Sequence, residues 1–306
     1  AAYFKLKHST ISGTGKECSI LAEKKYADLV KKLTFRGSFA PSRANATQLT
    51  FMTGEQLAGF DINFILGVYE NPGNWTPERG SHTHPFAEYL LFFGYDEEDL
   101  NYFGAELELF MGEEWEAHKI TTPTVALAPE NFPHCPLITE KVYRPFGHLH
   151  LAMSANYAGG PGPEEPDQVL TDGTKYNYLF KELKAEKGPG GADAVQYLTF
   201  SGADRKDFQI NFTMGLYNQP GKWNETKHTH PYDEILLFFG TRTEDLSYLG
   251  AEITIELGAE KHTFDVPTVV CIPKGLPHFP VTCHKVEKPY RMARIGLAPH
   301  YQINPV

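Results

Sequence analysis

The chain has 306 residues, a formal net charge of -10, and 41% apolar, 22% charged and 13% aromatic residues. This apolar and aromatic content is typical of a globular protein and excludes a disordered one. The acidic balance argues against nucleic acid as a partner, because phosphates attract a basic surface. No apolar run reaches the roughly 18 residues needed to cross a membrane, so we expect no membrane association.

The start of the chain gives an expectation about localisation. Residues 1–7 lack the apolar segment that a secretory signal peptide needs. The cysteines show no Cys-x-x-Cys spacing, which is typical of reduced thiols; they are Cys18, Cys135, Cys271 and Cys283. We therefore expect a cytoplasmic protein, unless a signal peptide has been removed.

A unit of roughly 130–150 residues occurs twice along the chain. Each copy opens with Lys-Tyr and a short helical pattern, at 25–26 and at 175–176, and we expect the second helix near 174–186. Matching segments follow in the same order: 60–64 with 208–212, 67–69 with 215–217, 72–75 with 220–223, 98–100 with 244–246, and 104–106 with 250–252. We expect two similar domains packed face to face, 20–157 and 174–304, joined by a Gly/Pro-rich linker over 158–173.

Strand patterns dominate both copies. Apolar and polar residues alternate over 105–110 and 251–256, and short β-rich runs at 124–127 and 268–272 each end at a proline. Many short strands separated by glycine and proline are typical of an all-β sandwich or barrel. The only helices we expect are short ones at the start of each repeat.

The most specific pattern is His-Thr-His-Pro, which occurs at 82–85 and 228–231. A glutamate stands four residues after the second histidine, and Pro-His-x-Pro follows later at 133–136 and 277–280. Alternate residues of a strand share a face, so the two histidines of each motif lie side by side, about 7 Å apart.

Three imidazoles and one carboxylate suit Mn, Fe, Ni, Cu or Zn. We expect one divalent transition metal per repeat, with Mn or Fe favoured. The predicted ligands are His82, His84, Glu88 and His134 in the first copy, and His228, His230, Glu234 and His278 in the second. Because these metals often take six ligands, such a site keeps positions for water or substrate, although one of the two copies could be purely structural.

This arrangement resembles the two sequence motifs of the cupin superfamily. The second motif is matched closely at 273–278, Pro-Lys-Gly-Leu-Pro-His, whereas 129–134 lack its glycine. With two copies, the chain looks like a bicupin. The resemblance implies an all-β fold of two double-stranded β-helix (jelly-roll) barrels in tandem, with a metal at the open centre of each.

The resemblance also suggests residues that contact substrate. Bicupin oxalate decarboxylases have an arginine three residues before the first metal histidine, which helps to hold a substrate carboxylate. Arg79 stands at that offset from His82, and Glu225 takes the place in the second copy. The chain shows no counterpart of their mobile acidic lid and is shorter, so a close match to oxalate decarboxylase is not expected.

Two further histidines share one face of a predicted strand at 147–151, His148 and His150. Facing inward they would be acid/base or orienting groups; facing outward they would only bind solvent or backbone. We match Arg294 to His148 and Gly296 to His150 in the second copy, which suggests different tasks for the two barrels. The candidate catalytic residues are Arg79, His148 and Arg294.

For the other conspicuous residues we expect mainly structural roles. Tyr69 and Tyr217 are candidates for lining the barrels, while Trp75 and Trp223 are expected to pack. Cys135 should point away from the ligand face, into the core. His118 and His262 are expected to be surface or structural residues.

The leading hypothesis is a metal-dependent enzyme acting on a small polar organic molecule that carries a carboxylate, enol or hydroxyl group. Oxidative chemistry, as in a dioxygenase or a decarboxylase, is favoured. A non-redox lyase, isomerase or hydrolase would use the same ligands. A binding or storage bicupin is the third alternative, although storage cupins typically lose ligands that this chain keeps. Besides the substrate, a second copy of the chain is a possible partner.

Overall fold

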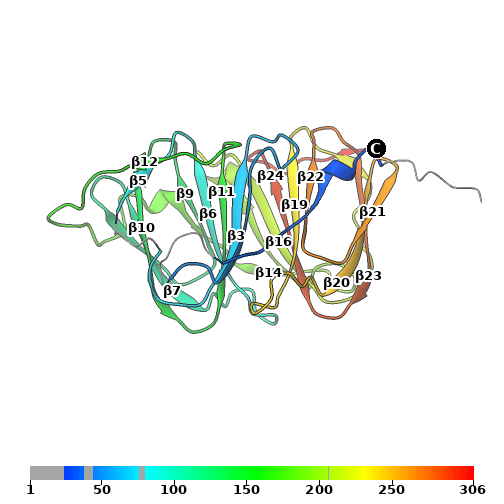
Figure 1. Ribbon diagram of the computed structural model, residues 1–306, viewed down its shortest axis with the longest axis horizontal. Coiled ribbons are helices and arrows are strands. Elements are labelled where there is room, and N and C mark those ends of the chain that lie inside the picture. Colours follow the sequence, from blue (N-terminus) through cyan, green and yellow to red (C-terminus); the bar gives the residue numbers. More distant parts are fainter. Residues whose placement is uncertain (1–23, 38–43, 76–79, 206) are drawn as a thin grey trace, which may run out of the picture.

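Two β-barrels lie side by side in the structure, a computed structural model that describes residues 24–37, 44–75, 80–205 and 207–306 (Figure 1). Each barrel is built from two antiparallel sheets. The expected all-β fold is confirmed. Among the described residues helix is limited to three single turns of 3-10 helix, η1 (Ala27–Leu29), η2 (Asn177–Leu179) and η3 (Gly202–Asp204).

In the first barrel the inner sheet has the order β13-β9-β6-β11-β3-β2, and the outer sheet the order β12-β5-β10-β7-β8, with β4 paired to β10. The inner strands are β2 (Gln48–Met52), β3 (Asn63–Tyr69), β6 (Glu88–Gly94), β9 (Thr124–Ala128), β11 (Phe146–Ala152) and β13 (Phe180–Glu182). The outer strands are β4 (Gly73–Asn74), β5 (His82–Thr83), β7 (Ala105–Met111), β8 (Glu116–Ile120), β10 (His134–Val142) and β12 (Gly160–Pro161).

The second barrel repeats this plan, with the inner order β1-β22-β19-β24-β16-β15-β14 and the outer order β21-β20-β23-β18-β25, with β17 on β23. Its inner strands are β1 (Val30–Lys32), β14 (Ala185–Lys187), β15 (Gln196–Ser201), β16 (Asn211–Tyr217), β19 (Glu234–Gly240), β22 (Thr268–Ile272) and β24 (Tyr290–Gly296). Its outer strands are β17 (Gly221–Lys222), β18 (His228–Thr229), β20 (Ala251–Leu257), β21 (Glu260–Phe264), β23 (His278–Val286) and β25 (Asn304–Pro305).

The two inner sheets face each other across the middle of the molecule (Figure 1). Alternate residues of β6 point into the first barrel, and the others, such as Phe93, pack against the second barrel, where Phe93 and Phe239 have ring centroids 6.0 Å apart. Every residue of β6 and of β19 is therefore buried. This explains the unbroken Leu-Leu-Phe-Phe runs, because a strand that is covered on both faces has no polar side.

The segments that open the two repeats are exchanged between the barrels. β1 pairs with β22 of the second barrel, and β13 pairs with β9 of the first. Just before β13, the backbone N–H groups of Lys175 and Tyr176 donate to the Glu116 carboxylate at 2.8 and 2.7 Å. Just before β1, Lys25 and Tyr26 donate to Glu260 in the same way, at 2.9 and 3.0 Å. Each barrel is thus completed by the other repeat.

The helix expected near 174–186 is wrong beyond its first turn. Only η2 is helical, and β13 and β14 follow it. Leu179, Phe180 and Leu183 are buried there, in the core that the two barrels share. Pairing with β9 buries these side chains and fills the backbone hydrogen bonds, which outweighs local helical propensity.

The first residues of the predicted linker, 158–173, are bound to the first barrel. β12 pairs with β5, and the Ala158 carbonyl lies 2.6 Å from Nδ1 of His84. The proposed division at 158–173 therefore leaves part of the first barrel in the linker. Of the helices among the described residues, none has the length and apolar character needed to cross a membrane.

Candidate metal centres

The four predicted ligands of the first barrel come together at one end of its interior. His82 begins β5, Glu88 begins β6 and His134 begins β10, while His84 lies between β5 and β6. β10 places His134 directly opposite His82. One ligand atom from each of the four residues lies within 4.8 Å of all the others. Ligands of a single ion, at about 2.0–2.2 Å from it, are separated by comparable distances.

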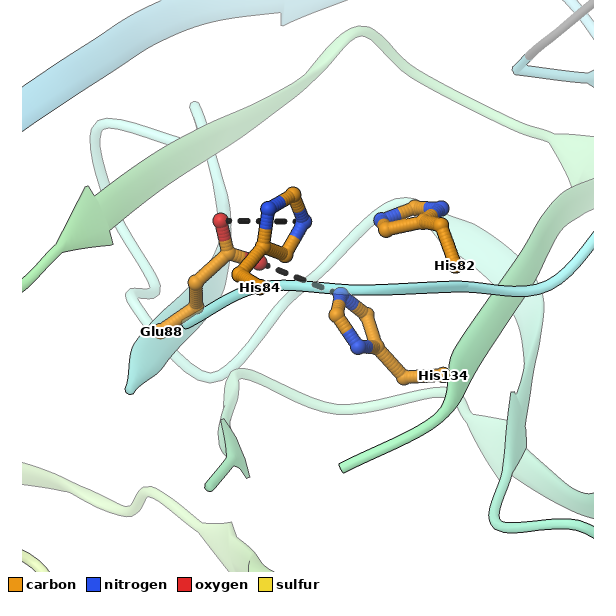
Figure 2. A group of neighbouring side chains, drawn as sticks. All are labelled: His82, His84, Glu88 and His134. Carbon is orange, nitrogen blue, oxygen red and sulfur yellow. Dashed lines mark hydrogen bonds and ion pairs between the residues drawn. The ribbon is translucent and has the colours of Figure 1, made fainter. Parts of the chain in front are cut away.

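Figure 2 shows Glu88 at one end of the group, joined by dashed lines to His84 and His134, with His82 at the other end. The Glu88 oxygens lie 3.4 Å from Nε2 of His84 and 3.1 Å from Nε2 of His134. The carboxylate is 1% exposed. A buried charge of this kind requires a cation or hydrogen-bond donors around it.

The second barrel brings its three histidines within 4.8 Å of one another, and Glu234 lies close to two of them. Nε2 of His228 lies 3.2 Å from Nε2 of His230. The Glu234 oxygens lie 3.2 Å from Nε2 of His230 and 3.3 Å from Nε2 of His278. Neither oxygen of Glu234 has a hydrogen-bond partner, although both are buried.

Backbone carbonyl groups orient five of the six imidazoles of the two centres in the same way. Each Nδ1 lies 2.6–3.1 Å from a backbone carbonyl oxygen, in His84, His134, His228, His230 and His278. A carbonyl only accepts, so Nδ1 carries the proton and Nε2 keeps its lone pair. In four of these residues, His84, His134, His230 and His278, Nε2 lies 3.1–3.4 Å from the glutamate of its group. Converging lone pairs and a buried carboxylate repel one another without a cation, so the residues present fit a divalent metal.

The protonation equilibria support neutral imidazoles in the first centre. Burial lowers the pKa of His82 to about 3, and the charged forms of His134 and His84 act in the same direction. Burial also lowers the pKa of His84. Although burial raises the pKa of the Glu88 carboxyl, the imidazoles of His150 and His134 outweigh it and hold that pKa below its ordinary value. An ionised carboxylate among neutral imidazoles is the form that binds metal.

His148 and His150 both face the inside of the first barrel. Nε2 of His150 lies 2.9 Å from Oε1 of Glu88, next to the metal group. The His148 ring is stacked on Phe92, and its Nδ1 lies 3.2 Å from the Leu91 carbonyl. Burial lowers the pKa of His148 to about 3, so this imidazole is neutral.

The sequence matching of this strand to the second repeat was wrong by two residues. β11 pairs His150 with Ile65 and His148 with Gly67 of β3. β24 pairs Arg294 with Thr213 and Met292 with Gly215 of β16. Since Gly67 and Gly215 correspond, Arg294 takes the place of His150, Met292 that of His148, and Gly296 that of Ala152.

Arg294 accordingly lies against the second metal group. Its Nε is 3.6 Å from Oε1 of Glu234, and its guanidinium also binds the Glu225 carboxylate and the Tyr301 hydroxyl. The Tyr301 hydroxyl donates to Glu225 at 2.8 Å, and Glu225 lies 3.8 Å from Nε2 of His228. A fixed cation and two further side chains therefore cover the second centre.

The first centre instead opens into a cavity of about 640 Å³, which His82, Glu88 and His134 line. A surface groove of about 620 Å³ reaches Arg294 and Tyr301, but none of the four second-centre residues lines it. The first centre therefore has room for an organic molecule beside the metal group, and the second is screened by Arg294.

Cys135 packs against the core, as expected, and is not part of the metal group, but it also lines the first cavity. It has a positive φ of 70°, and the pairing of β10 with β7 shifts register between His134 and Leu137. This bulge interrupts the alternation on which the prediction depended. Burial raises the pKa of the Cys135 thiol, which stays protonated. Cys271 and Cys283 are also free, and Cys18 lies outside the described residues.

The other sequence predictions have mixed outcomes. Tyr69 lines the first cavity, and its ring stacks on Trp75 with the ring centroids 3.9 Å apart. Tyr217 stacks on Trp223 in the second barrel, with the ring centroids 4.4 Å apart. His118 and His262 are buried structural residues, at 2.7 and 3.4 Å from Glu116 and Glu260. Arg79 lies outside the described residues.

One pair of site residues was missed. Nε2 of His84 lies 3.3 Å from the Tyr157 hydroxyl, and Tyr301 occupies the matching place in the second barrel. Both tyrosines follow the Pro-His motif at the same distance in the sequence, which was the available signal.

Comparison with known proteins finds relatives only in structure. No family model matches the chain, and no curated protein matches its sequence. A mutant of Bacillus subtilis oxalate decarboxylase is 11% identical over 98% of this chain and 81% of that one, with a TM-score of 0.62. Another structure of that enzyme, studied for its Mn(II) centers, has 12% identity, the same coverage and a TM-score of 0.61.

AerE from Microcystis aeruginosa is 12% identical over 89% of this chain and 99% of that one, with a TM-score of 0.53. The chain therefore has the two-barrel fold of the bicupins. Identities this low show a shared architecture but no reaction.

Proposed function

We propose that this bicupin is a metal-dependent enzyme that acts on a small organic molecule in the first barrel, with one divalent metal bound in each barrel. The observation that carries the proposal is the difference between the two centres. The first opens into a cavity of about 640 Å³ beside His82, Glu88 and His134. Arg294 and Glu225 occupy the space beside the second, whose metal would be structural.

Manganese is the favoured metal, and oxidative decarboxylation is the favoured reaction class. The imidazole and carboxylate ligands suit manganese, and the Bacillus oxalate decarboxylase of the same fold has Mn(II) centers. When bound, such an ion supplies a Lewis acid for a substrate oxygen and a redox partner.

The residues of the chain would hold the substrate and move protons. His150, whose Nε2 lies 2.9 Å from Oε1 of Glu88, would orient that carboxylate. The Tyr157 hydroxyl lies at the rim of the metal group and would donate a hydrogen bond or a proton to a substrate bound there. His148, neutral and held by the Leu91 carbonyl, would present a fixed polar edge in the cavity wall. Arg79, close in sequence to His82, remains a proposed contact for the substrate anion.

The test combines metal analysis with two matched variants. The purified protein should contain two metal ions per chain, and His134→Ala and His278→Ala should each lose one. With a substrate found by screening for O2 uptake and CO2 release, His134→Ala should lower kcat at least a thousandfold, and His278→Ala far less. An equal loss in both variants would refute the assignment of the reacting barrel. Full turnover with Zn under argon would reject oxidative chemistry in favour of a lyase, isomerase or hydrolase.

A further inference from the structure

The cavity of the first barrel has a polar end and an apolar wall. The polar end is the metal group. The wall is formed by side chains of β2, β3, β6 and β10; they are Leu49, Phe51, Ile65, Leu90 and Leu137. Its volume of about 640 Å³ is within the range of roughly 300–1,000 Å³ found for sites that hold drug-sized ligands.

The fold itself does not require this apolar wall. β2 pairs Phe51 with Ile65 of β3, and the second barrel pairs Thr199 with Thr213 at the corresponding positions of β15 and β16. The same two places are thus apolar and aromatic in the barrel with the open centre and hydroxyl-bearing in the other. Phe51 and Ile65 are only partly buried, so part of their surface is available to a ligand.

Basic residues line the groove that adjoins the cavity. Arg36 and Phe51 line both the cavity and a neighbouring groove of about 440 Å³, to which Lys31 and Lys32 also belong. Arg36 and Lys32 are exposed. Lys31 is paired with Asp28 at 3.1 Å, and Arg36 and Lys32 add positive charge at this point, which favours the approach of an anion to a chain of net charge -10.

We infer that the first barrel takes an amphipathic acid, with an oxygen-bearing end at the metal group and an apolar body against Phe51, Ile65 and Leu90. The identity of the polar end rests on the proposed function; the apolar wall is a separate observation. A two-carbon dicarboxylate such as oxalate would leave most of this wall uncovered. A longer aliphatic or aromatic body would remove it from water, which is favourable in proportion to the apolar area buried.

The inference is tested by calorimetric titration of the metal-loaded protein with oxalate, acetate, hexanoate, octanoate and phenylacetate. Each methylene that becomes fully buried should tighten binding by about fourfold. Octanoate and phenylacetate should therefore bind at least tenfold more tightly than acetate and oxalate. This series uses the unmodified chain, so it does not depend on any variant folding.

Substitution to the residues of the second barrel supplies the matched test. Phe51→Thr/Ile65→Thr should weaken octanoate at least tenfold while acetate affinity and metal content change less than twofold. Thr199→Val, at the corresponding place in the second barrel, should leave octanoate affinity unchanged. Unaltered melting temperatures of these variants would show that the barrel is intact.

The outcomes separate this inference from the proposed function. Equal affinity for acetate and octanoate, or no loss of octanoate affinity in the double variant, would overturn the amphipathic ligand while leaving the metal enzyme in place. A purified protein that takes up no metal at His82, His84, Glu88 and His134 would reject the proposed function. Preferential binding of octanoate by that metal-free protein would still support the apolar wall as a ligand site.

Discussion

Replacing Arg294 by methionine tests whether this side chain is the fixed cation of the second barrel. Its guanidinium lies 3.6 Å from the Glu234 carboxylate, which is 0% exposed, and it also binds Glu225. At an effective dielectric constant of about 20, one pair of charges at this distance attracts by about 4–5 kcal/mol. Removing one partner leaves a buried charge uncompensated, so Arg294→Met should lower the free energy of unfolding of the metal-free protein by about 3–5 kcal/mol.

Metal should reduce this loss, because an ion held by Glu234 and the three histidines supplies the missing positive charge. We expect a loss of no more than about 2 kcal/mol in metal-loaded protein, measured by urea denaturation with and without a chelator. Arg242→Met is the control, since Arg242 is an exposed partner of Glu244 and should cost no more than about 1 kcal/mol. Adding Glu225→Gln to Arg294→Met should restore part of the stability. A loss below about 1 kcal/mol in metal-free protein would refute the reasoning.

Three further predictions concern the segments exchanged between the barrels and the metal centres. Glu116→Ala should lower the free energy of unfolding, measured by urea titration, by about 2–4 kcal/mol, because the buried carboxylate accepts two backbone N–H groups and contacts the His118 imidazole. The control Glu140→Ala, at an exposed position, should lower it by less than about 0.5 kcal/mol. Gly112→Ala and Gly190→Ala both force alanine into a positive φ, but only at Gly112 would the new Cβ meet an aromatic ring, that of Tyr176, 2.3 Å away. The melting temperature of Gly112→Ala should therefore fall further than that of Gly190→Ala. Equal shifts would contradict the packing of Tyr176 against the first barrel. Dialysis against a chelator should lower the melting temperature of the protein. Readdition of Mn at a hundred times its Kd should raise the free energy of unfolding by about 2.7 kcal/mol. A melting curve that does not change with the chelator would count against both metal centres.

The ligand set could be predicted from the sequence because its spacing reflects strand geometry. His82 and His84 share a face at period two, and the glutamate and the Pro-His segment recur at matching places in both repeats. The all-β architecture was predictable for the same reason, from alternation and frequent turn residues. The 174–186 helix was not recognised as strand, because the partner that pairs with it, β9, belongs to the other repeat.

The register of β24 shows a limit of pattern matching. A shift of two residues keeps every side chain on the same face of a strand. Alternation therefore could not decide whether Arg294 is equivalent to His148 or to His150 of the first repeat. The hydrogen-bond register with β16 resolved the choice, and it placed the guanidinium beside Glu234. Cys135 reached the cavity through a backbone bulge that no apolar pattern records.

The sequence by itself determined that the chain is a duplicated β-protein with two His/Glu groups, since periodicity and spacing are local properties that one strand carries alone. Only the tertiary structure decided that the first group opens into a cavity while Arg294 covers the second. It also decided that each repeat completes the other's barrel through β1 and β13. The physical reason is the same in both cases: cavity shape and strand pairing are set by contacts between segments that lie far apart in the sequence, which no local pattern encodes.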